Sequence, residues 1–125
     1  MKMQELIEDI KNLNVLIVED DDDIREIMST PFGKICNTTR TAVDGEDGLK
    51  QFKENKPDII ITDIRMPNMN GNEMIEKIKE IDPSCPIVVV SGHGKMIRAT
   101  DKADVILEKP IKFDKLIEQI HQLTR

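Results

Sequence analysis

With 125 residues, the chain is long enough for one well-packed domain, and 34% charged against 38% hydrophobic residues is typical of a soluble globular protein. A net charge of −6 disfavours direct nucleic-acid binding, and no apolar run approaches the roughly 20 residues of a membrane span, so we expect neither kind of partner. The two cysteines fit no disulfide framework or metal spacing, and we expect a reducing, cytoplasmic location.

The chain begins with a segment of helical spacing. Its apolar residues recur every three or four positions, at Met3, Leu6, Ile7, Ile10 and Leu13. This pattern predicts an added amphipathic helix, so we divide the chain into an N-terminal helical extension, 1–13, and a main domain, 14–125. Two interpretations stay open for the extension. We favour packing on its own domain or the tail of an upstream linker; the alternative is a contact between copies, giving a monomer or a weak dimer.

Short apolar runs then alternate with helical patterns along the chain. Four runs rich in β-branched residues predict strands buried on both faces, at residues 15–18, 59–61, 87–90 and 105–107. A polar, threonine-rich run at 37–42 predicts an edge strand. Helical spacing appears at residues 24–28, 49–52, 74–81 and 113–123. The alternation predicts an open parallel sheet covered on both faces, in which ligands bind beyond the carboxyl ends of the strands.

Carboxylates follow two of these strands. The first run ends directly in Glu19 and Asp20, and the second ends in Asp63. Adjacent carboxylates at the end of a buried strand repel each other unless a cation neutralises them, and three converging there suit a hard divalent cation, Mg²⁺. Residues 21–23 are expected to be solvated and to cap the next helix. Taken singly, each acid is explained as well by a helix cap, so the predicted metal site depends on their convergence.

The two remaining strands end in a hydroxyl and an ammonium. Ser91 ends one run, and Lys109 follows the other, directly before Pro110. At the same sheet edge these two groups supply a hydrogen-bond donor and a positive charge, which an added phosphoryl group requires. Loops commonly contain serine, and Lys-Pro pairs commonly end helices, so the combination carries the argument.

Over residues 14–123 the chain resembles the receiver domain of two-component response regulators. The matching stretches are VLIVEDD at 15–21, PDIIITDIRMP at 57–67, VSG at 90–92 and KP at 109–110. The resemblance implies an α/β fold, a flavodoxin-like doubly wound sheet of five parallel strands in the order 2-1-3-4-5.

The resemblance also implies a phosphorylation site. Asp63 would accept a phosphoryl group from a histidine kinase or a phosphotransfer protein. Mg²⁺ would be bound directly by Asp20, Asp63 and the backbone carbonyl of Arg65, and mainly through water by Glu19. Such a domain is not an enzyme with an external substrate, because it catalyses only its own phosphorylation and dephosphorylation.

Further roles follow from the same resemblance. Lys109 would contact the Asp63 carboxylate and later a phosphoryl oxygen, and Ser91 would donate to the phosphoryl group. The Lys109–Pro110 peptide would be cis. Phosphorylation would switch a surface for a downstream protein target or for an effector domain lost from this chain. We expect Arg65 and His93 to tune hydrolysis of the phosphoryl group.

Three departures from the family pattern concern the surface through which phosphorylation would be signalled to a partner. Ile106 stands where an aromatic residue is usual, Lys102 stands where glycine is frequent, and the chain between Ser91 and Lys109 is short. We therefore predict a shortened fourth helix within residues 95–101, which becomes ordered on phosphorylation instead of responding to an aromatic side-chain flip.

Three rival functions fit the sequence less well. A receiver-like interaction module without phosphorylation is disfavoured by the complete set of acids, Ser91 and Lys109. A flavin-binding relative would need a glycine-rich loop after the first strand, where the chain is acidic. A Mg²⁺-dependent phosphatase would need a cap over a substrate pocket, for which the loops are too short.

Overall fold

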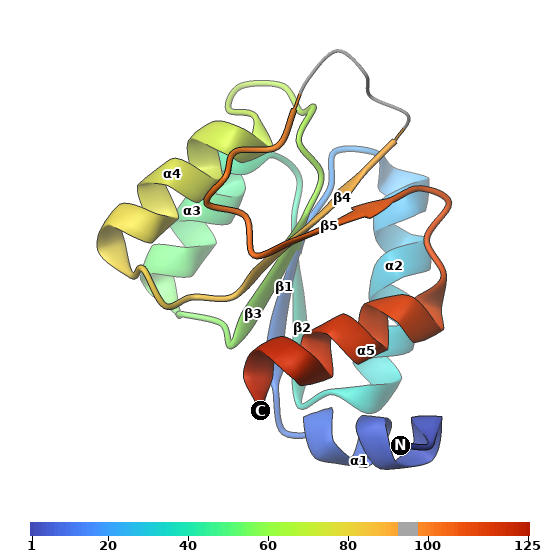
Figure 1. Cartoon of the computed structure of the whole chain (residues 1–125). Helices are drawn as coiled ribbons and strands as arrows, with labels where there is room; N and C mark the ends of the chain where they lie inside the picture. The colour runs from blue at the N-terminus through green and yellow to red at the C-terminus, as the bar shows by residue number, and fades with distance from the viewer. Residues whose placement is uncertain (93–97) are drawn as a thin grey trace.

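The structure is a computed structural model that describes residues 1–92 and 98–125. Its centre is a parallel sheet in the order β2-β1-β3-β4-β5, as predicted (Figure 1). The strands are β1 (Asn14–Val18), β2 (Thr38–Ala42), β3 (Ile59–Thr62), β4 (Ile87–Ser91) and β5 (Val105–Glu108). None of the helices in the described part of the chain has the length and apolar character to cross a membrane.

Helices cover both faces of the sheet. On one face lie α1 (Met3–Ile10), α2 (Asp22–Ile35) and α5 (Phe113–Thr124), and on the other α3 (Gly45–Glu54) and α4 (Gly71–Ile81) (Figure 1). Each face of the sheet has its own hydrophobic core, and successive strand residues point to the two cores alternately. Val15 and Ile17 pack in the core under α1, α2 and α5, and Leu16 and Val18 in the core under α3 and α4. A strand buried on both faces must be apolar at every position, which is why the runs of β1, β3 and β4 are continuous.

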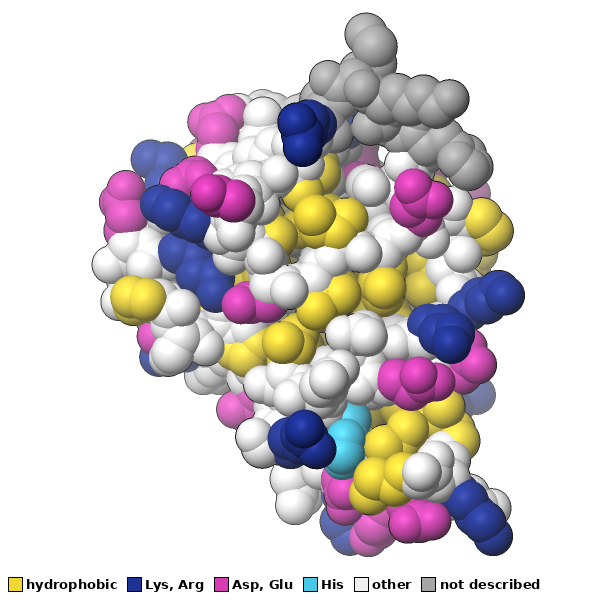
Figure 2. Space-filling model, viewed as in Figure 1, with side chains coloured by type: hydrophobic (Ala, Val, Ile, Leu, Met, Phe, Trp, Pro, Cys, Tyr) yellow, Lys and Arg dark blue, Asp and Glu magenta, His cyan; other side chains and the backbone are white. Residues whose placement is uncertain are grey.

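The two edge strands differ from the three central ones. β2 lies at one edge of the sheet, and most of its residues are half-buried or exposed, which confirms the predicted edge strand. β5 is the other edge, and the prediction that it is buried on both faces is wrong. Its side chains alternate between half-buried and exposed, and Ile106 is 53% exposed. The reason is its position, because an edge strand borders solvent; Figure 2 shows hydrophobic surface along this face of the molecule.

The predicted N-terminal helix is present as α1. Leu6 and Ile10 are buried in the same core as Phe32 and Ile117, and α1 lies against α5 (Figure 1). His121 Nε2 on α5 lies 2.9 Å from a carboxylate oxygen of Asp9. α1 thus packs on the domain that it precedes, whereas a contact between copies stays a prediction.

The connection between β4 and β5 includes the residues for which a short helix is predicted. Of residues 95–101, the first three lie outside the described residues, and residues 98–104 contain no helix. Side chains of α4 hold this segment instead. Asn72 donates to the carbonyl of Arg98 and accepts from the N–H of Thr100, both at 2.8 Å.

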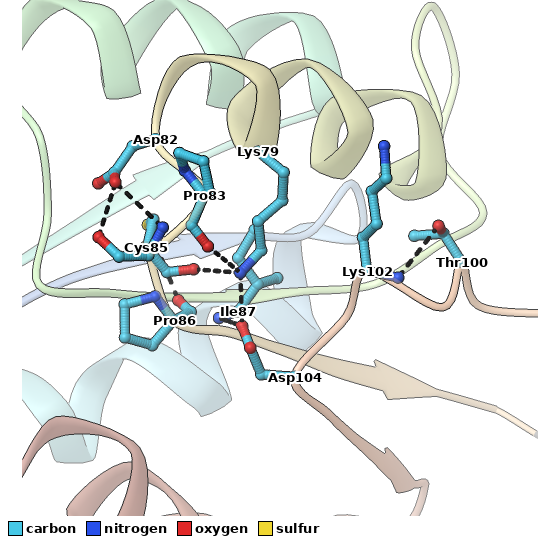
Figure 3. Close-up of polar contacts among 10 residues, drawn as sticks. Lys79, Asp82, Pro83, Cys85, Pro86, Ile87, Thr100, Lys102 and Asp104 are labelled. Atoms are coloured by element: carbon cyan, nitrogen blue, oxygen red, sulfur yellow. Dashed lines mark hydrogen bonds and ion pairs between the residues drawn. The ribbon is translucent and has the colours of Figure 1, made fainter.

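A second set of contacts anchors the same connection where β5 begins (Figure 3). The ammonium of Lys79, 11% exposed, donates to the Asp104 carboxylate at 2.9 Å and to the carbonyls of Cys85 at 2.7 Å and Pro83 at 3.4 Å. The same Asp104 oxygen accepts the N–H of Ile87 at 2.8 Å. We call these five residues the Lys79 network; it joins α4 to the amino ends of β4 and β5.

Candidate functional site

Glu19 directly follows β1, and both its backbone N–H and its carboxylate are held by hydrogen bonds. Its N–H donates to the carbonyl of Ala42 at 3.0 Å, which extends the pairing with β2. One carboxylate oxygen accepts the N–H of Asp21 at 3.1 Å, and the other lies 3.3 Å from Lys109 Nζ. Because Glu19 is only 2% exposed, its carboxylate is held at the sheet edge and is almost removed from water.

The acids that follow Glu19 divide as the sequence predicts. Asp20 is exposed beside the sheet edge. Asp21 is the N-cap of α2, and its carboxylate accepts the N–H of Ile24 at 2.9 Å. This confirms a capping role within residues 21–23, which separates them from Glu19 and Asp20.

Asp63 follows β3 and faces Lys109. Its N–H donates to the carbonyl of Val18 at 3.2 Å, so the residue is fixed against the end of β1. One carboxylate oxygen accepts the N–H of Ile64 at 2.7 Å, and the other accepts from Lys109 Nζ at 2.8 Å. The Lys109–Pro110 peptide is cis, as the resemblance implies.

Three carboxylates therefore converge at one edge of the sheet. Glu19, Asp20 and Asp63 each offer an oxygen, and these oxygens lie within 4.8 Å of one another. Among the residues that the structure describes, Lys109 contacts two of these acids, and the group of three carboxylates and one ammonium carries more negative than positive charge. An all-oxygen set with surplus negative charge fits a hard divalent cation such as Mg²⁺.

The pKa values of Glu19 and Lys109 are both raised at this edge of the sheet. Burial is the main cause that raises the pKa of Glu19, with contributions from Asp63 and Asp20, against the opposing N–H of Asp21 and the charge of Lys109. For Lys109, burial lowers the pKa, but the hydrogen bond and charge of Asp63 together with Glu19 outweigh it and raise the pKa overall. The lysine thus stays an ammonium, while the acids gain from any further positive charge.

Gly71 positions Asp63, a role that the sequence analysis did not assign. A Cβ atom on Gly71 would lie 2.2 Å from the carbonyl oxygen of Asp63 and 2.9 Å from Cα of Ile64. The N–H of Gly71 donates to the carbonyl of Ile64 at 2.7 Å, and the buried Thr62 hydroxyl donates to the carbonyl of Asp63 at 2.7 Å. The first residue of α4 therefore packs directly against the backbone of Asp63, where only glycine fits. In the sequence, the one sign of this contact is a glycine at the first position of the helix.

The other predicted site residues lie around this edge. Ser91 ends β4 and is half-buried, and its carbonyl accepts the N–H of Lys109 at 2.7 Å. Among the described residues, no hydrogen bond joins the Ser91 hydroxyl to Asp63 or Lys109. The side chain of Arg65 is exposed, and the predicted role of its carbonyl stays a prediction. His93 lies outside the described residues.

Comparison with known proteins assigns the class. The model of the response regulator receiver domain matches residues 15–121, and this chain belongs to that family. It is 32% identical over 116 residues to the chemotaxis protein CheY of Thermotoga maritima, covering 89% of this chain and 97% of that protein. It is 29% identical to the transcriptional regulatory protein AfsQ1 of Streptomyces coelicolor, covering 90% of this chain and 51% of AfsQ1.

Solved structures agree with this assignment. The response regulator TrrA of Thermotoga maritima, solved in complex with Mg²⁺–BeF, has 28% identity and a TM-score of 0.79, covering 88% of this chain and 97% of that one. This chain spans about half or less of the length of several curated relatives that it matches. The family implies a phosphoacceptor role in two-component signalling.

Proposed function

We propose that this chain accepts a phosphoryl group on Asp63 from a phosphohistidine of a histidine kinase or a phosphotransfer protein, in a reaction that depends on Mg²⁺. The single observation that carries the proposal is the contact of 2.8 Å between Lys109 Nζ and the Asp63 carboxylate, inside a group of three converging acids. The ammonium offsets the negative charge that the neighbouring acids place around the Asp63 carboxylate, the proposed nucleophile.

The proposed step makes one bond and breaks another. A carboxylate oxygen of Asp63 bonds to phosphorus while the phosphorus–nitrogen bond to the imidazole breaks, and that electron pair stays on the nitrogen. Positioning and charge neutralisation account for most of the catalysis of such transfers. Lys109 turns from the carboxylate to a phosphoryl oxygen, and the Ser91 hydroxyl donates to the phosphoryl group after local movement.

The same residues fit a role in holding Mg²⁺. Glu19 is buried and both of its carboxylate oxygens already accept hydrogen bonds, whereas Asp20 is exposed, which supports Asp20 as a direct ligand and Glu19 as a ligand through water. Both oxygens of Asp63 also accept hydrogen bonds, so its place as a direct ligand rests on the resemblance to the family. The backbone carbonyl of Arg65 completes the proposed set. When bound, the ion neutralises charge on the acids and on the transferred group. TrrA, with its Mg²⁺–BeF complex, is a precedent in a relative.

The proposed output is a change of the surface that a partner recognises. The partner is a downstream protein, or an effector domain of a longer regulator, and the site of action is the cytoplasm. The domain comprises residues 14–125, with residues 1–13 as its extension, and acts as a monomer or a weak dimer. The proposed ordering of the connection after Ser91 includes residues outside the described part of the chain and stays a prediction.

Labelling with a small phosphodonor tests the acceptor. We expect Asp63→Asn to abolish phosphate incorporation from acetyl phosphate in the presence of MgCl₂. Asp23→Asn, an exposed acid in the first turn of α2, is the matched control and should be labelled like the wild type. Full labelling of Asp63→Asn would place the chemistry elsewhere, and an unlabelled wild type would favour an interaction module without phosphorylation.

A further inference from the structure

Arg25 links helix α2 to the loop that carries the acids. Its Nη1 donates to the backbone carbonyl of Glu19 at 2.9 Å, and its Nη2 donates to the Asp22 carboxylate. Its own N–H donates to the carbonyl of Asp21 at 2.9 Å. The Arg25 side chain is 17% exposed, whereas that of Asp22 is 87% exposed, so the inner half of the fork is sheltered from water and the outer half is not.

The inner contact acts on the part of the backbone that orients two predicted site residues. The carbonyl of Glu19 belongs to the planar peptide unit that joins Glu19 to Asp20. The N–H of Glu19 is already fixed by Ala42, so the bond from Arg25 holds the other side of the residue. With both sides held, the directions in which the two carboxylates leave the backbone are restricted.

We propose that Arg25 is a positioning residue for Glu19 and Asp20, and that it sets the Mg²⁺ concentration needed to fill the site. The inference rests on the proposed function for the metal, and it adds a residue that does not itself contact the ion. Partners that orient metal ligands typically contribute 10- to 100-fold in metal affinity.

Charge alone predicts the opposite effect, which makes the inference testable. Removing a positive charge near the acids would tighten cation binding, whereas releasing the Glu19 carbonyl would weaken it. The charge effect is small, because the guanidinium is paired with Asp22 in a contact open to water and is screened there. We therefore expect positioning to dominate.

The test is a titration with MgCl₂ alone, followed by calorimetry and by the amide chemical shifts of Glu19 and Asp20, on the full chain. Arg25→Met should raise the Kd for Mg²⁺ about tenfold. Arg25→Lys keeps the charge but cannot reach two acceptors with a planar fork, and its Kd should fall between those of the wild type and Arg25→Met. Labelling of Asp63 by acetyl phosphate should shift to higher Mg²⁺ by the same factor, with little change at saturating metal.

Two control variants separate positioning from charge and from helix stability. Asp22→Asn removes the exposed partner but leaves the bond to Glu19, so its Kd should stay within about twofold of the wild type. Thr30→Gly weakens α2 away from the loop and should leave the Kd unchanged. An unchanged or lower Kd in Arg25→Met, or an equal rise in Thr30→Gly, overturns the inference alone. A wild type that binds no Mg²⁺ overturns both the inference and the proposed metal dependence.

Discussion

Two lysines hold groups of acceptors at opposite ends of the same sheet. Lys109, at the carboxyl edge, contacts Glu19 and Asp63, with Asp20 beside them. Lys79, at the amino ends of β4 and β5, contacts one carboxylate and two carbonyls (Figure 3). The first group has surplus negative charge and the second is balanced.

One acid near each end has a shifted pKa, and the two shifts run in opposite directions. At the carboxyl edge, burial raises the pKa of Glu19. Near the Lys79 network, hydrogen bonds from Lys56 and Ser84 lower the pKa of Asp82, the C-cap of α4, to about 2. A balanced group needs no further partner, whereas a group with surplus negative charge favours an added cation, as proposed here for Mg²⁺. This difference is our reason for treating the same residue types as structural at one end and as the proposed site at the other.

Displacing Asp63 should give the largest effect. In Gly71→Ala the new Cβ would meet the Asp63 carbonyl at 2.2 Å, a backbone atom that cannot move without disturbing the site. We expect a loss of about 3 kcal/mol in the free energy of unfolding, measured in urea, and a loss of most phosphate incorporation. Gly33→Ala is the matched control, because no described atom beyond its own stretch of helix backbone lies within 4 Å of the new Cβ, and in a helix it should gain about 0.5–1 kcal/mol. Equal stabilities for the two variants would contradict the close packing at Gly71.

Replacing each lysine by methionine compares the two ends directly. Lys79→Met leaves sheltered acceptors without their donor, and we expect it to cost about 2 kcal/mol of unfolding free energy, both in EDTA and in saturating MgCl₂. Lys109→Met should also destabilise the protein in EDTA, because Glu19 and Asp63 lose their common cation. In MgCl₂ that loss should shrink, because removing the ammonium beside the acids strengthens Mg²⁺ binding to the variant, and the more tightly bound cation stabilises its folded state more than that of the wild type. A Lys109→Met loss that is insensitive to Mg²⁺ would show that the two ends do not differ as we infer.

The sequence predicted the parts of this comparison that follow from strand order. Because β1 and β3 are continuous apolar runs, their ends were clear, and Glu19, Asp20 and Asp63 could be assigned to one edge. Lys109 follows the last strand and was found in the same way. Parallel strands bring their carboxyl ends together, so no side-chain geometry was needed.

The Lys79 network and the contacts of Asn72 could not be predicted in this way. They join side chains to backbone groups between segments distant in the sequence, such as Asn72 with Thr100, and leave no periodicity. Nor does a sequence reveal that residues 98–104 contain no helix, or that a glycine starting a helix touches the backbone of Asp63. The contact of Arg25 with Glu19 could not be predicted either, because an arginine three residues after Asp22 has the spacing of an ordinary surface ion pair.

The smallest expected effect is a pH dependence at the balanced end. Ser84 donates to the Asp82 carboxylate from its N–H at 3.1 Å and from its hydroxyl at 2.7 Å, and Lys56 forms an ion pair with it. The folded pKa of about 2 lies below the usual 3.8, so the stability that ionised Asp82 contributes is present above about 3.8 and is lost as the pH falls toward 2. The stability difference between the wild type and Asp82→Asn should therefore be largest near neutral pH and vanish across that interval. This difference in stability should be modest and should fall in high salt, because Lys56 is exposed.

Glu80→Gln is the control for this pH dependence, because Glu80 is an exposed acid at the end of the same helix and lacks the contacts of Asp82. A difference between wild type and Asp82→Asn that stays constant from neutral pH to pH 2 would remove Asp82 from the account of the balanced end.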